Sequence, residues 1–122
     1  MSYRIELSDN RKYLTCQIDV PLTAEVANAY TPELDRMSRE MGIKRFLFDV
    51  RNSRNALSTV DNYDYAHKEM KEMELQKDVR SAILVSPDDH SHDFFEIAGQ
   101  NEGYNIRIFR DESEAIAWLS EY

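Results

Sequence analysis

Carboxylates and imidazoles suited to binding a transition metal gather in one short segment of this chain, residues 88–93. The segment contains three aspartates beside His90 and His92, and both side-chain types are common metal ligands. Their spacing is poor for coordination, because side chains on a helix meet at intervals of three or four residues and adjacent ones face apart. We therefore predict no metal site, with His90 and His92 as weak candidate ligands. We interpret the segment as an acidic helix start with two exposed histidines.

A second group of polar residues follows the two strands that we predict over residues 46–50 and 82–85. In an open α/β sheet, ligands usually bind beyond the carboxyl ends of the parallel strands, where helix N-termini also attract anions. The residues that we expect to bind a ligand or an anion there are Arg51, Asn52, Arg54, Ser58, Asp88 and His90. The alternative is that the arginines only hold the loops through ion pairs with neighbouring aspartates, which are Asp88, Asp89 and Asp111.

Catalysis would need a nucleophile or an acid–base pair held in a pocket, such as Ser53 or Ser58 with His67 or His90. The sequence contains no nucleophile elbow, glycine-rich phosphate loop or paired metal-ligand motif. We predict no catalytic residues and no cofactor, and we favour a binding module over an enzyme. The other hypothesis is an enzyme or metal-binding protein that uses residues 88–93.

Strand periodicity indicates how the chain positions these groups. Alternating apolar residues predict an antiparallel hairpin over residues 3–18, in which Cys16 is a buried structural thiol. Apolar runs at residues 46–50 and 82–85 predict central parallel strands, and residues 104–109 predict a further one. The fold class is therefore α/β, with a single mixed sheet of about five strands and about four helices.

Helical spacing predicts helices that begin near Thr23, Ser58, Ser91 and Asp111. Pro32 should kink the first helix near Asn28, or should lie in the first turn of a shorter helix capped by Thr31. We expect the half of this helix before Pro32 to open as a lid, because a broken helix opens locally at lower cost. The second helix should bury an apolar stripe, with His67 partly buried beside it; the stripe residues are Val60, Tyr63, Ala66, Met70 and Met73.

Length and charge limit the class of protein. With 122 residues the chain fits one domain, which we place at 1–122. Its net charge of −8 repels phosphate backbones, so we predict no nucleic-acid partner. The sequence has a single cysteine and neither a signal peptide nor a long apolar run, so we expect a cytoplasmic protein with no integral membrane segment.

The order of these elements resembles that of the SpoIIAA-like proteins in the STAS superfamily. The most specific part is the C-terminal strand, acidic turn and Trp-Leu pattern over residues 104–119. In anti-anti-sigma members of the superfamily, a phosphorylated serine at the start of a helix controls partner binding. Ser58 and Thr59 fall at the two serine positions of that motif, whereas Leu57 and Val60 stand where it has aspartate and glycine.

This resemblance implies a non-enzymatic regulatory or binding module. Its partner is expected to be a protein or a small amphiphilic ligand, with Ser58 and Thr59 as the positions for phosphorylation. The SpoIIAA-like branch is also similar in fold to CRAL-TRIO lipid-exchange domains, which implies an apolar ligand between the sheet and a mobile helix. The sequence leaves open whether the chain forms a homodimer.

Overall fold

The computed structural model describes residues 3–121, which contain one mixed sheet in the order β1-β2-β3-β4-β5. Strands β1 (Tyr3–Leu7) and β2 (Leu14–Ile18) form an antiparallel hairpin. Strands β3 (Arg45–Asp49), β4 (Arg80–Leu84) and β5 (Asn105–Phe109) follow in parallel to β2. The predicted mixed α/β sheet is therefore confirmed.

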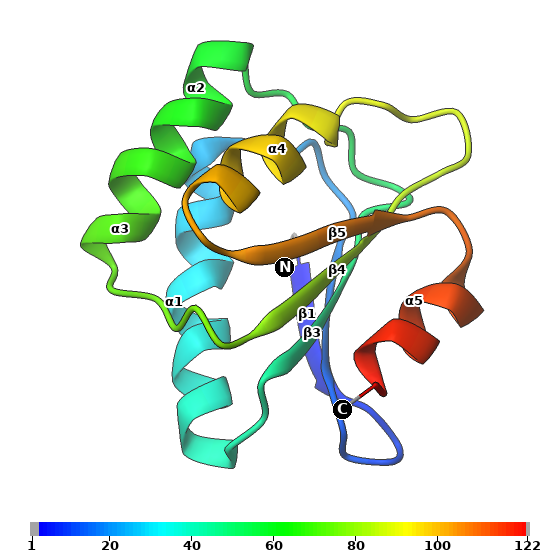
Figure 1. Ribbon diagram of the computed structural model, residues 1–122. Coiled ribbons are helices and arrows are strands. Elements are labelled where there is room, and N and C mark those ends of the chain that lie inside the picture. Colours follow the sequence, from blue (N-terminus) through cyan, green and yellow to red (C-terminus); the bar gives the residue numbers. More distant parts are fainter. Residues whose placement is uncertain (1–2, 122) are drawn as a thin grey trace.

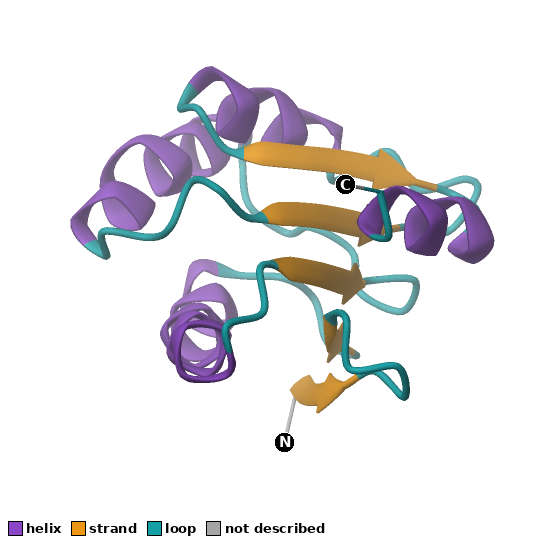
Figure 2. Ribbon diagram, turned by 60° about the horizontal axis from the view of Figure 1, so that its bottom comes forward, coloured by secondary structure: helices purple, strands orange, loops and turns teal. Residues whose placement is uncertain are grey.

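Helices cover both faces of this sheet unequally (Figures 1 and 2). On one face lie α1 (Ala24–Met41), α4 (Asp93–Asn101) and a segment that runs through α2 (Thr59–Asp64), the π-helix η1 (Tyr65–Glu69) and α3 (Met70–Glu72). On the other face lies α5 (Glu112–Leu119). None of the helices within residues 3–121 is long and apolar enough to span a membrane.

Alternation along the strands divides the buried residues into two layers, because successive side chains in a strand point to opposite faces. The larger layer lies under α1, η1 and α4 and includes Cys16, Phe46 and Ile83. The smaller layer lies under α5 and includes Leu47 and Leu84. Cys16 is buried as expected, and burial raises the pKa of its thiol to about 12. The sequence also predicts one apolar face of the last helix from Ala115, Trp118, Leu119 and Tyr122, of which Tyr122 lies outside the described residues.

Pro32 lies inside one continuous helix, so the prediction of a shorter helix beginning after Thr31 is wrong. Proline lacks the amide that would bond to the carbonyl of Asn28, a loss that costs about 3 kcal/mol in a helix interior. Asn28 and Pro32 both lie on the exposed side of α1, where water can bond to the free carbonyl. The flanking turns keep the helix intact because their buried residues, Ala27 and Leu34, pack on the sheet.

The apolar stripe predicted for the second helix is wrong at its first two residues, because Val60 and Tyr63 are 66% and 45% exposed. The cause is the π-turn, in which the amide of Met70 donates to the carbonyl of Tyr65 five residues earlier. One extra residue in a turn rotates everything before it by about 100°. Asn62 and Tyr65 therefore face the core instead. His67 is exposed rather than partly buried, and it is hydrogen-bonded to Glu102.

Three of the four predicted helix starts have the expected caps. The side chains of Thr23, Ser58 and Asp111 accept hydrogen bonds from backbone amides in the first turns of α1, α2 and α5. The fourth start differs, since Ser91 accepts from the amide of Asn55 rather than capping α4. His92 occupies the N-cap position there and is buried, so the prediction of two exposed histidines is wrong for this one.

The Ser58 cap gives a stability prediction. Ser58 Oγ accepts from the amide of Asp61 at 3.1 Å, so Ser58→Ala leaves that amide without its partner and should lower the free energy of unfolding by about 0.5 to 2 kcal/mol. Ser58→Gly should cost less, because glycine is itself tolerated at the N-cap. Urea unfolding measures both, and an alanine variant as stable as the parent protein would show that the cap contributes nothing.

Candidate functional site

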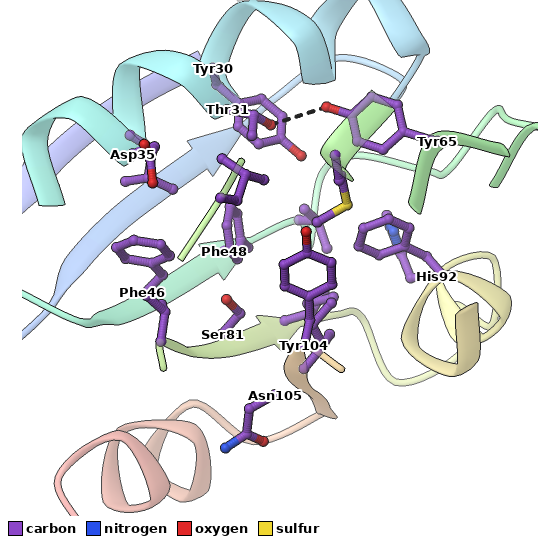
Figure 3. Close-up of a pocket in the computed structure, with 18 of the residues that line it drawn as sticks. Tyr30, Thr31, Asp35, Phe46, Phe48, Tyr65, Ser81, His92, Tyr104 and Asn105 are labelled. Carbon is purple, nitrogen blue, oxygen red and sulfur yellow. Dashed lines mark hydrogen bonds between the residues drawn. The ribbon is translucent and has the colours of Figure 1, made fainter. Parts of the chain in front are cut away.

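A cavity of about 100 Å³ lies between the sheet and the helices of the more fully covered face. Side chains from α1, β3, β4, β5, η1, α3 and the start of α4 line it (Figure 3). Most of the lining is apolar or aromatic, and a few hydroxyl, amide and imidazole groups converge on the same space. Concave, mainly apolar sites with few polar groups are the usual form of small-molecule pockets.

The floor of the cavity is set by strand register. Phe46 lies opposite Ser81, and Phe48 lies opposite Ile83, all on one face of the sheet. The rings of Phe46 and Phe48 meet edge to face, with centroids 6.1 Å apart. Ser81 is the small residue in this row, and it leaves room beside the two phenylalanines that a larger side chain would fill.

Helices supply the walls through aromatic side chains. Tyr30 of α1 packs against Phe48, with ring centroids 5.9 Å apart. Tyr65 of η1 packs against Phe95 of α4, with centroids 6.4 Å apart. Tyr65 reaches this position because of the π-turn described above. The rings of Tyr30, Phe48, Tyr65 and Phe95 therefore border the cavity.

Three tyrosine hydroxyls are the main polar groups of the lining. The Tyr65 hydroxyl is hydrogen-bonded to Thr31 Oγ1 at 3.2 Å. Burial raises the pKa of Tyr30 well above 10 and that of Tyr65 to about 12. Burial also raises the pKa of Tyr104. All three side chains therefore remain protonated at neutral pH and act as hydroxyl donors.

His92 is the buried histidine of the lining, with 2% of its surface exposed. Its Nε2 lies 2.8 Å from the carbonyl oxygen of Ser53 and 3.6 Å from a carboxylate oxygen of Asp89. Because a carbonyl only accepts, the network assigns the ring proton to Nε2 and leaves Nδ1 as an acceptor. Burial lowers the pKa of His92 despite the bond to Ser53 and the charge of Asp89, so the ring is neutral at neutral pH.

The loops at the carboxyl ends of the parallel strands meet, as expected for such a sheet. The guanidinium of Arg110 donates to the carbonyl of Asp89 at 3.0 Å, and its Nη2 lies 3.1 Å from His90 Nδ1. The hydroxyl of Ser86 donates to the carbonyl of Arg51 at 2.7 Å. These contacts join the ends of β3, β4 and β5 into one polar edge.

The arginines of the predicted ligand or anion site are already paired in this structure. Arg51 forms an ion pair with Asp49 at 2.8 Å, and its hydrogen bonds hold the pKa of that carboxyl below the usual value although burial would raise it. Arg54 is largely exposed and lies 3.8 Å from Asp89. Asp89 is one of the partners that the alternative interpretation expected, whereas Asp49 is not.

The remaining predicted residues are exposed at the same edge, and these are Asn52, Ser58, Asp88 and His90. The cavity lining within residues 3–121 includes none of the six predicted ligand or anion residues. His90 pairs with Asp93 at 3.1 Å while His92 turns inward, so the two imidazoles serve different parts of the fold. No cluster of three or more metal-ligating side chains occurs in the part of the chain that the structure describes.

Sequence reasoning missed the tyrosines and the histidine of the cavity. Hydrophobic spacing places Tyr30 in the first helix and Tyr104 in the last strand, and it gives no separate role to Tyr65. The missed signal was the chemistry of the apolar positions. An expected core face that carries tyrosine and serine hydroxyls indicates a polar lining, since buried hydroxyls need partners.

Comparison with protein-family models gave no match for this chain. Comparison with curated protein sequences also gave none. Among solved structures, the chain is similar to an uncharacterised protein of the DUF3478 family with a SpoIIAA-like fold from Shewanella loihica PV-4. The sequences are 25% identical, the match covers 96% of this chain and 91% of that one, and the TM-score is 0.60.

This chain has a SpoIIAA-like fold. The resemblance inferred from the element order and the C-terminal pattern is thereby confirmed. A SpoIIAA-like fold suggests a STAS-type module, and the cavity lies on the face of its sheet that α1, η1 and α4 cover.

His92 gives a prediction about pH. Its pKa is lowered from 6.5 in the folded protein, so the unfolded chain binds a proton at a higher pH than the folded one. The stability that neutral His92 contributes is therefore full above about pH 6.5 and is lost as pH falls through the folded pKa, by at most about 1.4 kcal/mol per pH unit.

The measurement is urea unfolding between pH 7.5 and 5.5 for the parent protein and for His92→Gln, whose amide still donates to the carbonyl of Ser53. The variant should lose less stability over this range than the parent. Parallel losses in the two proteins would assign the pH dependence to other groups, of which Asp89, Asp93 and Arg54 are the charged neighbours.

Proposed function

We propose that this chain is a non-enzymatic SpoIIAA-like module, a single domain over residues 1–122, whose cavity binds a small amphiphilic ligand. The observation that supports this proposal is the mainly apolar space between the sheet and α1, into which a few hydroxyls converge. Apolar walls favour the transfer of a hydrocarbon group from water, at about 25 cal/mol per Å². The hydroxyls favour a ligand with one polar end.

The size of the cavity limits what binds without rearrangement. An engineered protein cavity of about 150 Å³ binds benzene, and the cavity here is about 100 Å³. A rigid cavity of this size holds only a few non-hydrogen atoms. A longer ligand requires that one wall move outward.

Helix α1 is the wall best suited to move. Tyr30, Thr31 and Leu34 line the cavity from this helix, and Pro32 removes a backbone hydrogen bond among them. Thr31 of this part of α1 is hydrogen-bonded to Tyr65 of η1, and Glu33 accepts a hydrogen bond from the hydroxyl of Tyr3 in β1. A single hydrogen bond contributes about 0.5 to 1.5 kcal/mol, which a ligand can replace.

Hydrogen exchange tests this proposal. Amides of residues 23–30 should exchange fast in the free protein and should slow when 1-octanol is added, because binding favours the state in which α1 is ordered and packed on the ligand. Amides of residues 82–86 should stay protected in both samples, since β4 is central. Equal protection of both segments without ligand would remove the evidence for a mobile wall, and native mass spectrometry with lipid extraction would identify a natural ligand.

A matched pair of variants separates binding in the cavity from binding elsewhere. Ser81→Ile fills the space beside Phe46 and should abolish the response to 1-octanol. Thr15→Ile makes the same kind of change on the opposite face of the sheet, where Thr15 lies beside Leu47, and should leave the response intact. A response that survives Ser81→Ile would place the ligand outside the cavity.

A second candidate function is supported by the exposed apolar residues of α2. Val60 and Tyr63 face solvent because of the π-turn, and they lie beside the exposed hydroxyls of Ser58 and Thr59. Exposed apolar side chains next to a modifiable residue suit a protein partner whose binding is controlled by phosphate. Arg51 and Arg54 lie on the preceding loop, and a phosphate would compete with Asp49 and Asp89 for these two cations.

Phosphopeptide mass spectrometry of the protein from its native cells tests this second candidate. Phosphate on Ser58 or Thr59 is the expected result. Ser58→Asp should then mimic the added charge while keeping the helix cap, because aspartate is an equally good N-cap residue. Protein that carries phosphate at neither position under any growth condition would remove the switch.

A further inference from the structure

Two hydroxyls in the cavity have no acceptor among residues 3–121. Tyr30 and Tyr104 point into the same space from α1 and from the start of β5 (Figure 3). Neither hydroxyl forms a hydrogen bond within the part of the chain that the structure describes. The hydroxyl of Tyr65, in contrast, is bonded to Thr31. Both hydroxyls are accessible from the cavity rather than fully buried, since the buried side-chain atoms without a partner among the described residues are Ser53 Oγ and Glu69 Oε2. The Tyr30 and Tyr104 hydroxyls are therefore open to a ligand that enters the cavity.

His92 adds the complementary group. Its Nε2–H is used by the carbonyl of Ser53, at 2.8 Å. The ring is neutral, so Nδ1 keeps an acceptor lone pair on a side chain that lines the cavity. The lining therefore offers both donors and an acceptor to a polar group placed between Tyr30, Tyr104 and His92.

The same lining disfavours an ionised ligand. Among the described residues that line the cavity, none is lysine or arginine, and Lys77 Nζ lies outside the lining, 5.2 Å from the Tyr104 ring centroid and bonded to the carbonyl of Glu102. A carboxylate inside the cavity would therefore have no counter-ion in direct contact. Asp35 lies in the lining, but it is paired with Arg39 at 2.8 Å, so it is not free to balance an ammonium group. Burying an unpaired charge costs several kcal/mol more than burying a hydrogen-bonded neutral group.

We propose that the cavity selects an uncharged amphiphile whose polar end carries both a hydrogen-bond donor and an acceptor, as in an alcohol. The ligand hydroxyl accepts from Tyr30 or Tyr104 and donates to Nδ1 of His92, while its hydrocarbon part lies along Phe46, Phe48 and Ile83. This inference rests on the proposed ligand-binding function and adds the charge state and head-group chemistry of the ligand.

Binding of 1-hexanol, hexanoate and hexylammonium at pH 7.5 tests it, because the three share a six-carbon chain and differ in the charge of the head. Protein-detected NMR titration measures each affinity, with benzene as a purely apolar fourth ligand. We expect 1-hexanol to bind at least about tenfold more tightly than either ion. An ion that binds as tightly as 1-hexanol overturns the selectivity.

Phenylalanine variants test the assigned groups. Tyr30→Phe combined with Tyr104→Phe should weaken 1-hexanol about two- to tenfold, leave benzene unchanged and leave the protein as stable as before, because the lost hydroxyls have no protein partner. Tyr13→Phe, on the α5 side of the sheet, is the matched control and should change neither affinity. An unchanged affinity for 1-hexanol in the double variant overturns the assignment of the tyrosines.

Benzene separates a failure of the head-group selectivity from a failure of the proposed ligand-binding function. If benzene and the three six-carbon molecules all fail to shift the resonances of cavity residues, the cavity does not bind small molecules and the proposed function fails. If benzene binds while the charged and uncharged molecules bind equally, the proposed function stands and the head-group selectivity is overturned.

Discussion

Backbone pairing of β3 with β2 on one side and β4 on the other is the constraint on which the rest of the structure depends. This register places Phe46 between Leu14 and Ser81, and Phe48 between Cys16 and Ile83. A shift of one residue would exchange the two faces of the strand. Phe46 and Phe48 would then lie under α5, and Leu47 would replace them on the cavity floor. The existence of the cavity therefore follows from the sheet register.

The helices above that floor are held apart by the sizes and positions of their aromatic residues. The π-turn at η1 rotates Tyr65 inward, where it meets Phe95 and bonds to Thr31. Without the extra residue, regular helical spacing would turn Tyr63 toward the core in the preceding turn, where Asn62 faces the core now. The same turn exposes Val60 and Tyr63 on the outer surface of α2. One local irregularity thus supplies a wall of the cavity and the apolar surface considered for a protein partner.

Buried hydrogen bonds connect the cavity to the polar edge of the sheet. His92 reaches the carbonyl of Ser53 in the loop after β3. In the same region the hydroxyl of Ser91 accepts a hydrogen bond from the backbone amide of Asn55. The side-chain amide of Asn55 donates to the side chain of Asn62 in α2 at 2.7 Å. Because unpaired buried polar groups are costly, these bonds fix the loop that carries Arg51 and Arg54 relative to α4. The polar edge and one wall of the cavity therefore share these hydrogen bonds.

The amino-acid sequence by itself determined the strands, their order and the capped helix starts. These features depend on local patterns: alternation in the hairpin, apolar runs in β3 and β4, and Thr23, Ser58 and Asp111 as caps. Short-range steric and hydrogen-bonding preferences decide such features, so they can be inferred from neighbouring residues. The SpoIIAA-like fold followed from their order.

Tertiary structure alone decided which residues meet. Tyr30, Tyr65, His92 and Tyr104 are far apart in the sequence and share no motif, and they converge only because three helices pack on one face of the sheet. The spacing of hydrophobic residues does not indicate the π-turn, so the inward position of Tyr65 was not predictable from the sequence. The burial of His92 likewise depends on the loop after β3, which supplies its carbonyl partner from 39 residues away. Long-range packing and buried hydrogen bonds determine these positions, so they cannot be inferred from the conformational preferences of neighbouring residues.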